Sequence, residues 1–581
     1  MLLTAEQRAA VCCDEDTLLE ACPGSGKTRA IVAKVMRCLD TVRGGPRKIA
    51  VITYTNAAVY EIESRLRIYG CSEDLDLCDV STIHSFCLNN ILRPFAWRCP
   101  EYANGFTLLP TDSDDYQVII GEVCAVHRLP RNAADQFALL NRTPAGEPIL
   151  NDASLITRDA AFAFWQKLQA RGYVDFATII YLTFRLLAGY PSLAHAMSCR
   201  YRWILVDEFQ DTTELQVEIL KRIHDASHSD FFLVGDPHQS IYGFAGARPT
   251  LSNEFAGHIG ARRDFQLSQN WRSGPPIIAH AEHLRPRSVP MVSAGEATEF
   301  THTPVYVHST TPQEAIEQFF LPALDELGID YGRAAILAPW WTTLIGVGRH
   351  LRALAIPVIG PGARPYRASN VFARLAEYCC EYIERRNPVL IRNLQRELQR
   401  LAAEATDEFR GDAFSHAGRT TIFQLLAIGT ELRTQSESAE RWLTEAARLF
   451  TDRLIHDGFL PRSAGAMLPE SARAMCEQMR RSGVDVTNLA VSDLGLFAAT
   501  GHSLQLLTMH AAKGLEWDAV ALIGLNDGQI PNFRATRDED IDEHRRLFYV
   551  GITRARKYLL YVSDQSNVRN TPSRFITELE L

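Results

Sequence analysis

The sequence predicts an α/β protein built from two parallel-sheet cores, each interrupted by a helical insertion. Short apolar runs bounded by turn residues alternate with helical patterns, at residues 49–53, 203–206, 231–234 and 265–267. Similar runs return at residues 334–338, 504–507, 520–525 and 558–562. Two long stretches between them, from about residue 100 to 195 and from about 386 to 497, have helical patterns without comparable strands. These stretches divide the strands into two groups.

Length and composition narrow the class of protein. The 581 residues exceed the size of one ordinary domain, and 46% hydrophobic with 22% charged residues is typical of folded proteins. Sixty basic against sixty-nine acidic residues give a net charge of −9. Any contact with nucleic acid must therefore come from a local basic groove rather than from overall charge.

Nothing in the sequence predicts a membrane or secreted protein. No apolar run approaches the ~20 residues that span a bilayer, and the first ten residues lack the pattern of a secretory signal. The thirteen cysteines are spaced too irregularly for a zinc motif. We expect reduced thiols, a cytoplasmic location and no membrane partner.

The strongest local signal is a glycine-rich turn between a strand-like run at residues 17–19 and a helix with an apolar face. Here Ala21 stands where the general phosphate-loop pattern has its first glycine. Such a loop cradles phosphates with backbone N–H groups, a lysine reaches the β and γ oxygens, and a hydroxyl ligates Mg²⁺. The predicted nucleotide-binding residues of this loop are Cys22, Pro23, Gly24, Ser25, Gly26, Lys27 and Thr28.

A second candidate lies at the end of the apolar run 203–206. Asp207 is predicted to hold Mg²⁺ through water, and Glu208 to orient or deprotonate the attacking water. An acidic pair after a strand is common, but together with Lys27 it predicts an ATPase. GTP is disfavoured because no Asn-Lys-x-Asp motif occurs.

The motifs resemble those of the UvrD/Rep/PcrA helicases of superfamily 1. Residues 207–212, Asp-Glu-Phe-Gln-Asp-Thr, resemble motif II of that family, and the other motifs occur in the same order along the chain. The matches are Gln7 before the phosphate loop, then residues 53–57 (Ia), 82–84 (Ib), 235–247 (III), 267–273 (IV), 508–517 (V) and 549–555 (VI).

The resemblance implies two RecA-like P-loop cores with ATP between them, and a second core that supplies arginines to the γ-phosphate. The arginine positions match Arg272 and Arg554, and Gln239 matches the sensor of the γ-phosphate. The remaining nucleotide contacts implied are Gln7 and Trp271 on adenine, Glu516 on ribose, and Arg29, for which an exposed arginine of the first helical turn is the alternative.

The resemblance also implies a track for single-stranded DNA. Base-stacking positions match Tyr54, Tyr242 and Phe244, since stacking on aromatic rings grips bases without reading sequence. Polar contacts to phosphates match Thr55, Asn56, Thr82, His84, Thr508 and His510; for His84 a structural histidine is the alternative.

The expected domains follow the family pattern. Core 1A comprises residues 1–100 and 196–275, insertion 1B residues 101–195, core 2A residues 276–385 and 498–581, and a reduced insertion 2B residues 386–497. The implied activity is ATP-dependent translocation along single-stranded DNA in the 3′→5′ direction.

One departure leaves a second function open. The hairpin that splits duplex in relatives corresponds to residues 563–571, which are short and carry no aromatic residue. We therefore expect weak duplex opening, and no C-terminal nuclease or partner-binding extension. The alternative is an ATPase that senses DNA ends and regulates a separate nuclease, similar to the helicase partners of OLD-family nucleases in antiphage systems such as Gabija.

The same motifs argue against a third function, that of a P-loop kinase. A P-loop kinase would leave the arginines of motifs IV and VI and the aromatic residues unexplained. The acidic run at residues 537–543 is expected only to favour the positive N-terminal end of its helix.

Overall fold

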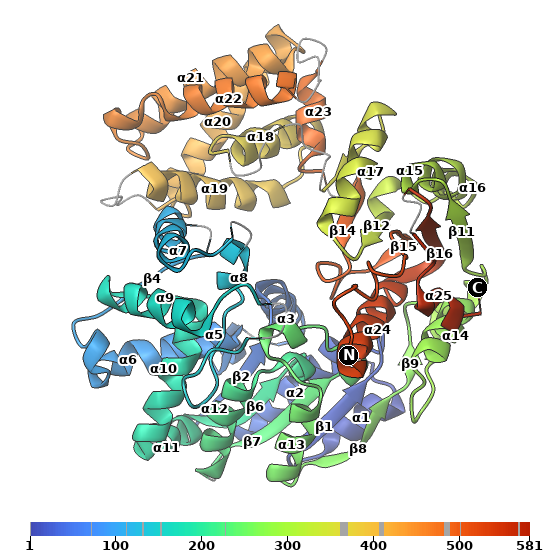
Figure 1. Cartoon of the computed structure of the whole chain (residues 1–581). Helices are drawn as coiled ribbons and strands as arrows, with labels where there is room; N and C mark the ends of the chain where they lie inside the picture. Colours follow the sequence, from blue (N-terminus) through green and yellow to red (C-terminus); the bar gives the residue numbers. More distant parts are fainter. Residues whose placement is uncertain are drawn as a thin grey trace. The chain divides into compact units, whose positions relative to one another are not determined.

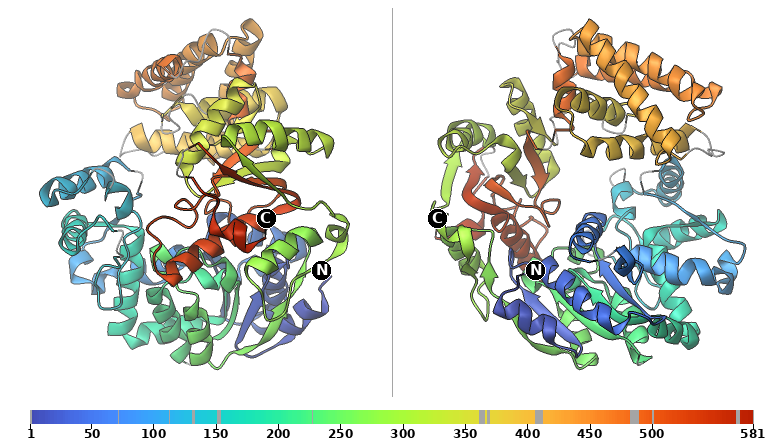
Figure 2. Two further views of the ribbon diagram at one scale, coloured as in Figure 1. Left: turned by 45° about the vertical axis from the view of Figure 1, so that its right-hand side comes forward. Right: turned by 180° about the vertical axis from the view of Figure 1, so that it is seen from behind.

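The structure is a computed structural model that describes residues 2–70, 72–111, 113–130, 133–150, 154–226, 228–360, 366, 370–405, 412–481, 489–499, 501–566 and 570–580. It divides into two compact units (Figures 1 and 2). Unit 1 comprises Met1–Thr301 and Pro531–Thr553, and unit 2 comprises His302–Ile530 and Arg554–Leu581.

Unit 1 is built on a six-stranded parallel sheet with the order β3-β2-β6-β7-β1-β8. Its central strands are almost fully buried, as expected for a parallel sheet covered on both faces. The strands are β1 (Thr17–Ala21), β2 (Lys48–Thr53), β3 (Cys78–Thr82), β6 (Tyr201–Val206), β7 (Asp230–Gly235) and β8 (Arg262–Leu267).

Helices cover both faces of this sheet (Figure 1). One hydrophobic core lies against α1 (Ala5–Cys12), α2 (Lys27–Cys38) and α3 (Asn56–Tyr69). The core on the other face includes α5 (Ile83–Cys87), α10 (Phe176–Gly189), α11 (Pro191–Arg200), α12 (Glu214–Asp225) and α13 (Thr250–His258).

Local capping explains where several of these helices begin. The Thr4 and Thr213 side chains form capping boxes with the glutamines three residues later, at α1 and α12. Thr55 and Thr82 accept backbone N–H groups at the starts of α3 and α5.

The segment between β3 and β6 is mainly helical. A separate core joins α7 (Asp114–His127), α8 (Ala134–Phe137) and α9 (Arg158–Ala170). Its extended pairings include the two-residue strands β4 (Thr107–Leu108) and β5 (Tyr173–Val174) and an isolated bridge between Arg142 and Pro148.

Unit 1 is completed by α14 (Pro275–Leu284) and α24 (Asp538–Ile552), with a short parallel pair, β9 (Gln269–Asn270) and β10 (Val292–Ser293). Helix α24 comes from far along the chain.

Unit 2 contains a second six-stranded parallel sheet with the order β11-β16-β15-β12-β14-β13. Its strands are β11 (Val305–Ser309), β12 (Ala334–Ala338), β13 (Val358–Ile359), β14 (Leu504–Thr508), β15 (Trp517–Leu522) and β16 (Ala555–Asp564). Helices outside the bundle are α15 (Pro312–Ala315), α16 (Leu321–Glu326), α17 (Trp341–Ala353) and α25 (Arg574–Glu578).

A bundle with its own hydrophobic core interrupts this second sheet along the chain (orange in Figure 1). It contains α18 (Ala373–Arg385), α19 (Val389–Ala405), α20 (His416–Gln435), α21 (Ala439–His456), α22 (Met467–Arg481) and α23 (Val491–Leu496). The first helix of the bundle therefore begins at Ala373, 13 residues before the expected boundary at 386, and the four-part domain division stays a prediction.

The predicted α/β class with two parallel sheets is confirmed. All eight apolar runs listed from the sequence contain or overlap a strand. The strands that were not predicted are β3, β11 and β13 of the two large sheets and the two-residue strands β4, β5, β9 and β10. In the described residues no single helix is both long and apolar enough to cross a membrane. Helices α10 and α11 reach that length and apolarity only together, and the pair is bent by 104°.

Candidate active site

The predicted phosphate loop connects β1 to α2 and depends on two glycines. Gly24 and Gly26 have φ values of 67° and 81°, a region that glycine adopts at little cost. A Cβ at Gly24 would lie 2.6 Å from Asn270 Oδ1, and one at Gly26 would lie 2.7 Å from Gln7 Nε2. Both the backbone conformation and the close packing therefore require glycine, and the loop ends at a helix N-terminus that suits an anion.

The other loop residues support this turn. The Ser25 hydroxyl donates to the Cys22 carbonyl at 2.6 Å, and burial raises the pKa of Cys22 to about 12, so this thiol stays protonated. Pro23 is buried, Thr28 is half-buried and Arg29 is exposed.

Gln7 is buried against the loop. Its Oε1 accepts the Thr4 N–H in the capping box of α1, and its Nε2 donates to the Ser25 carbonyl at 2.9 Å. The cap of α1 thus fixes a side-chain amide beside the phosphate loop.

Lysine and two carboxylates meet at the carboxyl edge of the sheet. The chain leaves β6 at Asp207, whose N–H donates to the Ile52 carbonyl of β2, while Lys27 begins α2. Lys27 Nζ lies 3.6 Å from Glu208 Oε2. Asp207 is buried, and desolvation together with the neighbouring Glu208 carboxylate raises the pKa of Asp207 to about 7.

Glu208 has an unusual backbone conformation. Its φ of 50° lies in the left-handed region, which costs a non-glycine residue free energy and is concentrated at functional sites. Its N–H donates to Asp207 Oδ1 at 2.9 Å, and its carboxylate accepts the Gln210 side-chain amide. Glu208 is therefore held beside Lys27 by local contacts.

The turn after β7 adds a buried ion pair that we did not single out from the sequence. Asp236 Oδ1 lies 2.6 Å from Arg287, and Asp236 Oδ2 accepts Gln239 Nε2 at 2.6 Å. Burial alone would raise the pKa of Asp236, but the Arg287 guanidinium outweighs it and lowers the pKa to about 2. The Tyr549 hydroxyl of α24 accepts a second Arg287 hydrogen bond at 2.9 Å. The position of Gln239 is thus set by this charged network.

Arg272 and Trp271 lie beside the phosphate loop. The Trp271 N–H donates to the Gly24 carbonyl at 3.0 Å, and the Trp271 side chain is 46% exposed. Arg272 Nη1 donates to the Thr553 carbonyl at 3.1 Å. Arg272 therefore belongs to the compact unit that holds the loop, whereas Arg554 belongs to unit 2.

Aromatic residues form a row after β2 and β7. The rings of Tyr54 and Tyr242 are stacked with centroids 5.1 Å apart, and Phe244 meets Tyr242 edge-on at 5.9 Å. Phe244 is 39% exposed, while the two tyrosines are half-buried. Phe244 is therefore the ring of the three most open to a ligand.

The polar residues predicted near this row have structural roles as well. Thr55 and Thr82 cap α3 and α5, and Asn56 is exposed in the first turn of α3. The His84 ring lies edge-on to Phe176 at 5.5 Å, and burial lowers the pKa of His84 to about 4. His84 is therefore a neutral histidine at pH 7.

Four predicted residues lie in unit 2. The Thr508 hydroxyl at the end of β14 accepts the Ala511 N–H at 3.3 Å, and His510 follows in the same turn. The Arg554 guanidinium is buried and donates to the Leu515 carbonyl at 3.1 Å, and Glu516 pairs with Arg556 at 3.3 Å. Motifs V and VI thus meet at the amino ends of β15 and β16, which Leu515 and Arg554 precede.

Helix α24 ends in the first residues of motif VI, but its acidic first turns were assigned no part in the site from the sequence. Arg546 donates to the Ser240 carbonyl at 2.6 Å, and Asp542 pairs with Arg285. Glu543 Oε1 accepts the Phe244 N–H at 3.3 Å, and burial raises the pKa of Glu543. The acidic run at residues 537–543 therefore anchors the loop that carries Phe244, a role that could not be recognised from a run of acids alone.

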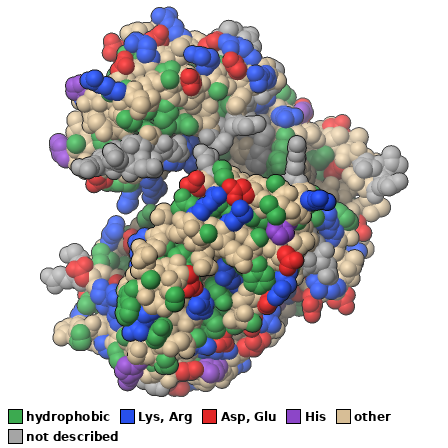
Figure 3. Space-filling view, turned by 60° about the vertical axis from the view of Figure 1, so that its left-hand side comes forward, with side chains coloured by type: hydrophobic (Ala, Val, Ile, Leu, Met, Phe, Trp, Pro, Cys, Tyr) green, Lys and Arg blue, Asp and Glu red, His purple; other side chains and the backbone are tan. Residues whose placement is uncertain are grey.

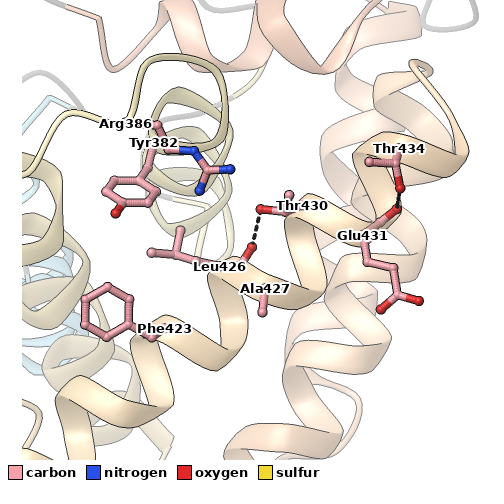
Figure 4. A pocket seen from close by; sticks show the side chains of 8 residues that line it. All are labelled: Tyr382, Arg386, Phe423, Leu426, Ala427, Thr430, Glu431 and Thr434. Carbon is pink, nitrogen blue, oxygen red and sulfur yellow. Dashed lines mark hydrogen bonds between the residues drawn. The ribbon is translucent and has the colours of Figure 1, made fainter.

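A separate pocket of about 460 Å³ lies in the helical bundle (Figure 4). The Thr430 and Thr434 hydroxyls donate to carbonyls of their own helix, so they offer no convergent donors. None of the predicted site residues lines this pocket. Its lining residues are Tyr382, Arg386, Phe423, Leu426, Ala427, Thr430, Glu431 and Thr434.

Comparisons with known proteins agree with the order of the motifs. The family described as UvrD/REP helicase N-terminal domain matches residues 3–259, and the UvrD-like helicase C-terminal domain matches residues 484–566.

Similar proteins align over almost the whole chain. ATP-dependent DNA helicase Rep of Buchnera aphidicola is 25% identical over 97% of this chain and 95% of its own length. ATP-dependent DNA helicase PcrA of Leuconostoc citreum is 26% identical over 97% of this chain and 82% of its own length. ATP-dependent DNA helicase UvrD2 of Mycobacterium tuberculosis is also 26% identical, over 95% of this chain and 78% of its own length. The matched domains and the phosphate-loop geometry together show that this chain belongs to the UvrD/Rep/PcrA-like family of superfamily 1A helicases.

Proposed function

We propose that this protein is an ATP-dependent DNA helicase that translocates along single-stranded DNA in the 3′→5′ direction. The observation that carries the proposal is the cluster of Lys27, Asp207 and Glu208 at the end of a glycine-built phosphate loop, with Lys27 Nζ 3.6 Å from Glu208 Oε2. The relatives named ATP-dependent DNA helicases support ATP as the fuel and DNA as the substrate.

The residues present fit a nucleotide with Mg²⁺. Asp207 is a buried carboxylate whose raised pKa reflects missing compensation for its charge, which a divalent cation would supply. Thr28 and Asp207 would hold the ion, and Gly24, Ser25, Gly26 and Lys27 would hold the phosphates. When bound, Mg²⁺ neutralises phosphate charge during phosphoryl transfer.

In the proposed mechanism Glu208 accepts a proton from the attacking water. Its left-handed backbone and the amide of Gln210 orient the carboxylate, and Lys27 Nζ lies 3.6 Å from it. Arg272 and Arg554 would stabilise charge on the phosphoryl group. Gln239 would contact the γ-phosphate and couple its presence to the Asp236–Arg287 pair through the hydrogen bond to Asp236. Gln7, Arg29, Trp271 and Glu516 would contact the rest of the nucleotide.

For DNA, we propose that bases stack on Phe244 and on the Tyr54–Tyr242 pair. Each such stack contributes about 1–3 kcal/mol regardless of base identity. On the face shown in Figure 3, basic and acidic side chains are interspersed, which supports a local track rather than a broadly basic surface. The proposed phosphate contacts are Thr55, Asn56, Thr82, His84, Thr508 and His510.

The second candidate function is a DNA-end-sensing ATPase that regulates a separate nuclease of the OLD family in antiphage defence. It is favoured by the short segment at residues 563–571, of which residues 567–569 lie outside the described part. The same feature supports weak opening of long blunt duplexes by this chain alone.

One experiment separates the two candidates. ATPase rates are measured with long single strands and with short duplexes that have free ends, alongside displacement of a labelled strand from duplexes with a 3′ or a 5′ tail. A motor gives ATPase that rises with strand length and displaces strands from 3′-tailed substrates, whereas a sensor responds to ends without displacement. Glu208→Gln is the inactive control, and the absence of any DNA stimulation would contradict both.

A further inference from the structure

Two histidines and an aspartate gather at the amino ends of the strands of unit 1, away from the phosphate loop. Helix α12 ends with His224 and Asp225, and α13 ends with His258. Because helices in a parallel α/β layer run opposite to the strands, their C-termini lie where strands begin. His224 accordingly contacts Asp16, which directly precedes β1, and Phe231 at the start of β7.

The potential ligand atoms of these three residues are close together. Asp225 Oδ1 lies 2.7 Å from His258 Nε2 and 3.7 Å from His224 Nδ1, and all three atoms lie within 4.8 Å of one another. Ligand atoms of a tetrahedral zinc ion are roughly 3.3 Å apart, given bonds of about 2.0–2.2 Å. Small side-chain rotations would therefore accommodate an ion between them.

A second observation concerns how His224 is oriented. His224 Nε2 lies 3.0 Å from Asp16 Oδ2, and the other oxygen of Asp16 accepts the Phe231 N–H at 2.6 Å. In a neutral ring with its proton on Nε2, Nε2 donates to Asp16 and the Nδ1 lone pair faces Asp225 and His258. Nδ1 is buried and makes no hydrogen bond within the described residues. A carboxylate behind a histidine that presents its other nitrogen is the arrangement that orients metal ligands in proteins.

We propose that His224 Nδ1, the Asp225 carboxylate and His258 Nε2 bind a first-row transition metal ion of the zinc class. Two imidazoles and one carboxylate suit Zn²⁺ and its neighbours rather than Mg²⁺ or Ca²⁺. The Asp225 and His258 side chains are 55% and 40% exposed, so water completes the coordination shell. The ion would join the ends of α12 and α13, which follow the segments that carry Glu208 and Phe244.

A competing cluster is included in the test. His195, Cys199 and His228 also offer three ligand atoms, with Cys199 Sγ 3.6 Å from His195 Nε2. All three are exposed, and among the described residues no carboxylate is hydrogen bonded or ion-paired to either histidine. The test therefore uses a His195→Gln/His228→Gln background so that zinc bound there is not counted.

The experiment titrates Zn²⁺ into the full chain, stripped with a chelator and free of nucleotide, by calorimetry. One equivalent of bound zinc and a rise in melting temperature are expected. His258→Gln should lower the affinity by at least tenfold, and Asp16→Asn by about 10–100-fold because it disorients His224. The exposed His302→Gln is the matched control and should bind like its parent.

Cobalt provides an independent readout. Co²⁺ should give visible absorption bands in the background protein that are lost in His258→Gln, while both proteins melt at the same temperature in chelator. Zinc binding of equal strength in His258→Gln and its parent, or no saturable binding in the parent, would overturn the proposal. Neither result would bear on ATP hydrolysis, because no proposed nucleotide contact is altered.

Discussion

At the scale of single residues, two buried aspartates of the site differ in how far the fold compensates their charge. Asp207 is buried with a carboxylate neighbour and has a raised pKa, whereas Asp236 is buried against Arg287 and has a lowered one. The two aspartates directly follow the neighbouring strands β6 and β7, yet their environments shift their pKa values in opposite directions. The proposed cation would compensate the charge of Asp207, whereas Asp236 is already paired with Arg287.

Glu208→Gln should reduce ATP turnover by about 10²–10⁴-fold, because the amide cannot accept a proton from water. The amide preserves the size of the side chain, so folding and ATP binding should be retained. Steady-state ATPase and fluorescent-nucleotide binding measure the two properties. Glu254→Gln, an exposed change in the same unit, should have the parent rate, and an active Glu208→Gln would exclude Glu208 as the base.

The Asp236–Arg287 pair makes a prediction about pH. The pKa of Asp236 is about 2 in the folded protein, below its ordinary value of 3.8, so its ionised form stabilises the folded state above about pH 4. That stability is lost as the pH falls from about 4 towards 2. Arg287→Met should cost about 3–5 kcal/mol at pH 7, because it leaves a buried carboxylate unpaired.

Melting curves across a pH series test this prediction. In Arg287→Met the pKa of Asp236 rises, so the acid-induced loss of stability specific to this pair should disappear. Arg158→Met removes an exposed partner of Glu147 and is expected to change the stability little, because water screens this pair. Equal destabilisation by the two substitutions would show that the buried pair contributes no more than a surface pair.

At the scale of elements, parallel strands bring distant motifs together. Residues that follow β1, β2, β6, β7 and β8 come from separate stretches of the chain, and each stretch ends at the same edge of one sheet. Helix α24 adds a contact from residues almost 300 positions away, through Glu543 and the Phe244 N–H. The loop that carries Phe244 is thereby held by an element outside the sheet.

Glu543→Ala should lower DNA-stimulated ATPase much more than basal ATPase, because the loop with Tyr242 and Phe244 loses its acceptor. Phe244→Ala should act in the same direction, with a 5- to 150-fold loss of DNA affinity for about 1–3 kcal/mol of stacking. Glu543→Gln keeps an acceptor and should restore most of the stimulation. Rates with and without oligothymidine measure both effects.

Glu539→Ala is the matched control for this element, since Glu539 is exposed in the first turn of the same helix. It should leave both rates unchanged. If Phe244→Ala reduced basal and DNA-stimulated ATPase equally, the ring would not be a DNA contact. If Glu543→Ala reduced both rates equally, α24 would act on the nucleotide site instead.

At the scale of the whole molecule, the proposed function requires both units. The phosphate loop, Glu208 and Arg272 belong to unit 1, while Arg554, Glu516 and Thr508 belong to unit 2. The boundary falls between Thr553, whose carbonyl accepts Arg272, and Arg554, whose guanidinium donates to Leu515. Motif VI therefore joins the two units along the chain.

Arg554→Ala should reduce ATP turnover by about 10³–10⁵-fold if its guanidinium acts on the transferred phosphoryl group. ATP binding, carried mainly by unit 1, should be retained, and circular dichroism checks that the buried substitution does not unfold unit 2. Arg556→Ala, which removes the partner of Glu516, is the control and should change turnover only slightly. Normal turnover in Arg554→Ala would remove unit 2 from the hydrolytic step.

The sequence by itself determined the class of fold and most of the strands, because buried parallel strands require continuous apolar runs that local composition reveals. It also predicted the phosphate loop and the acidic pair, whose glycines and carboxylates are adjacent in the chain. Strand β3 was not predicted because its five residues are only half-buried and mostly polar, so no apolar run marks it.

Only the tertiary structure decided the partners that come from distant segments. Arg287 stands in a stretch with no recognisable motif, and its pairing with Asp236 depends on how α14 and the following turn return to the sheet. The acids of α24 and the cluster of His224, Asp225 and His258 likewise acquire their contacts from helices packed side by side. Local patterns report burial and turns, whereas long-range electrostatic pairing depends on packing that no short stretch of sequence encodes.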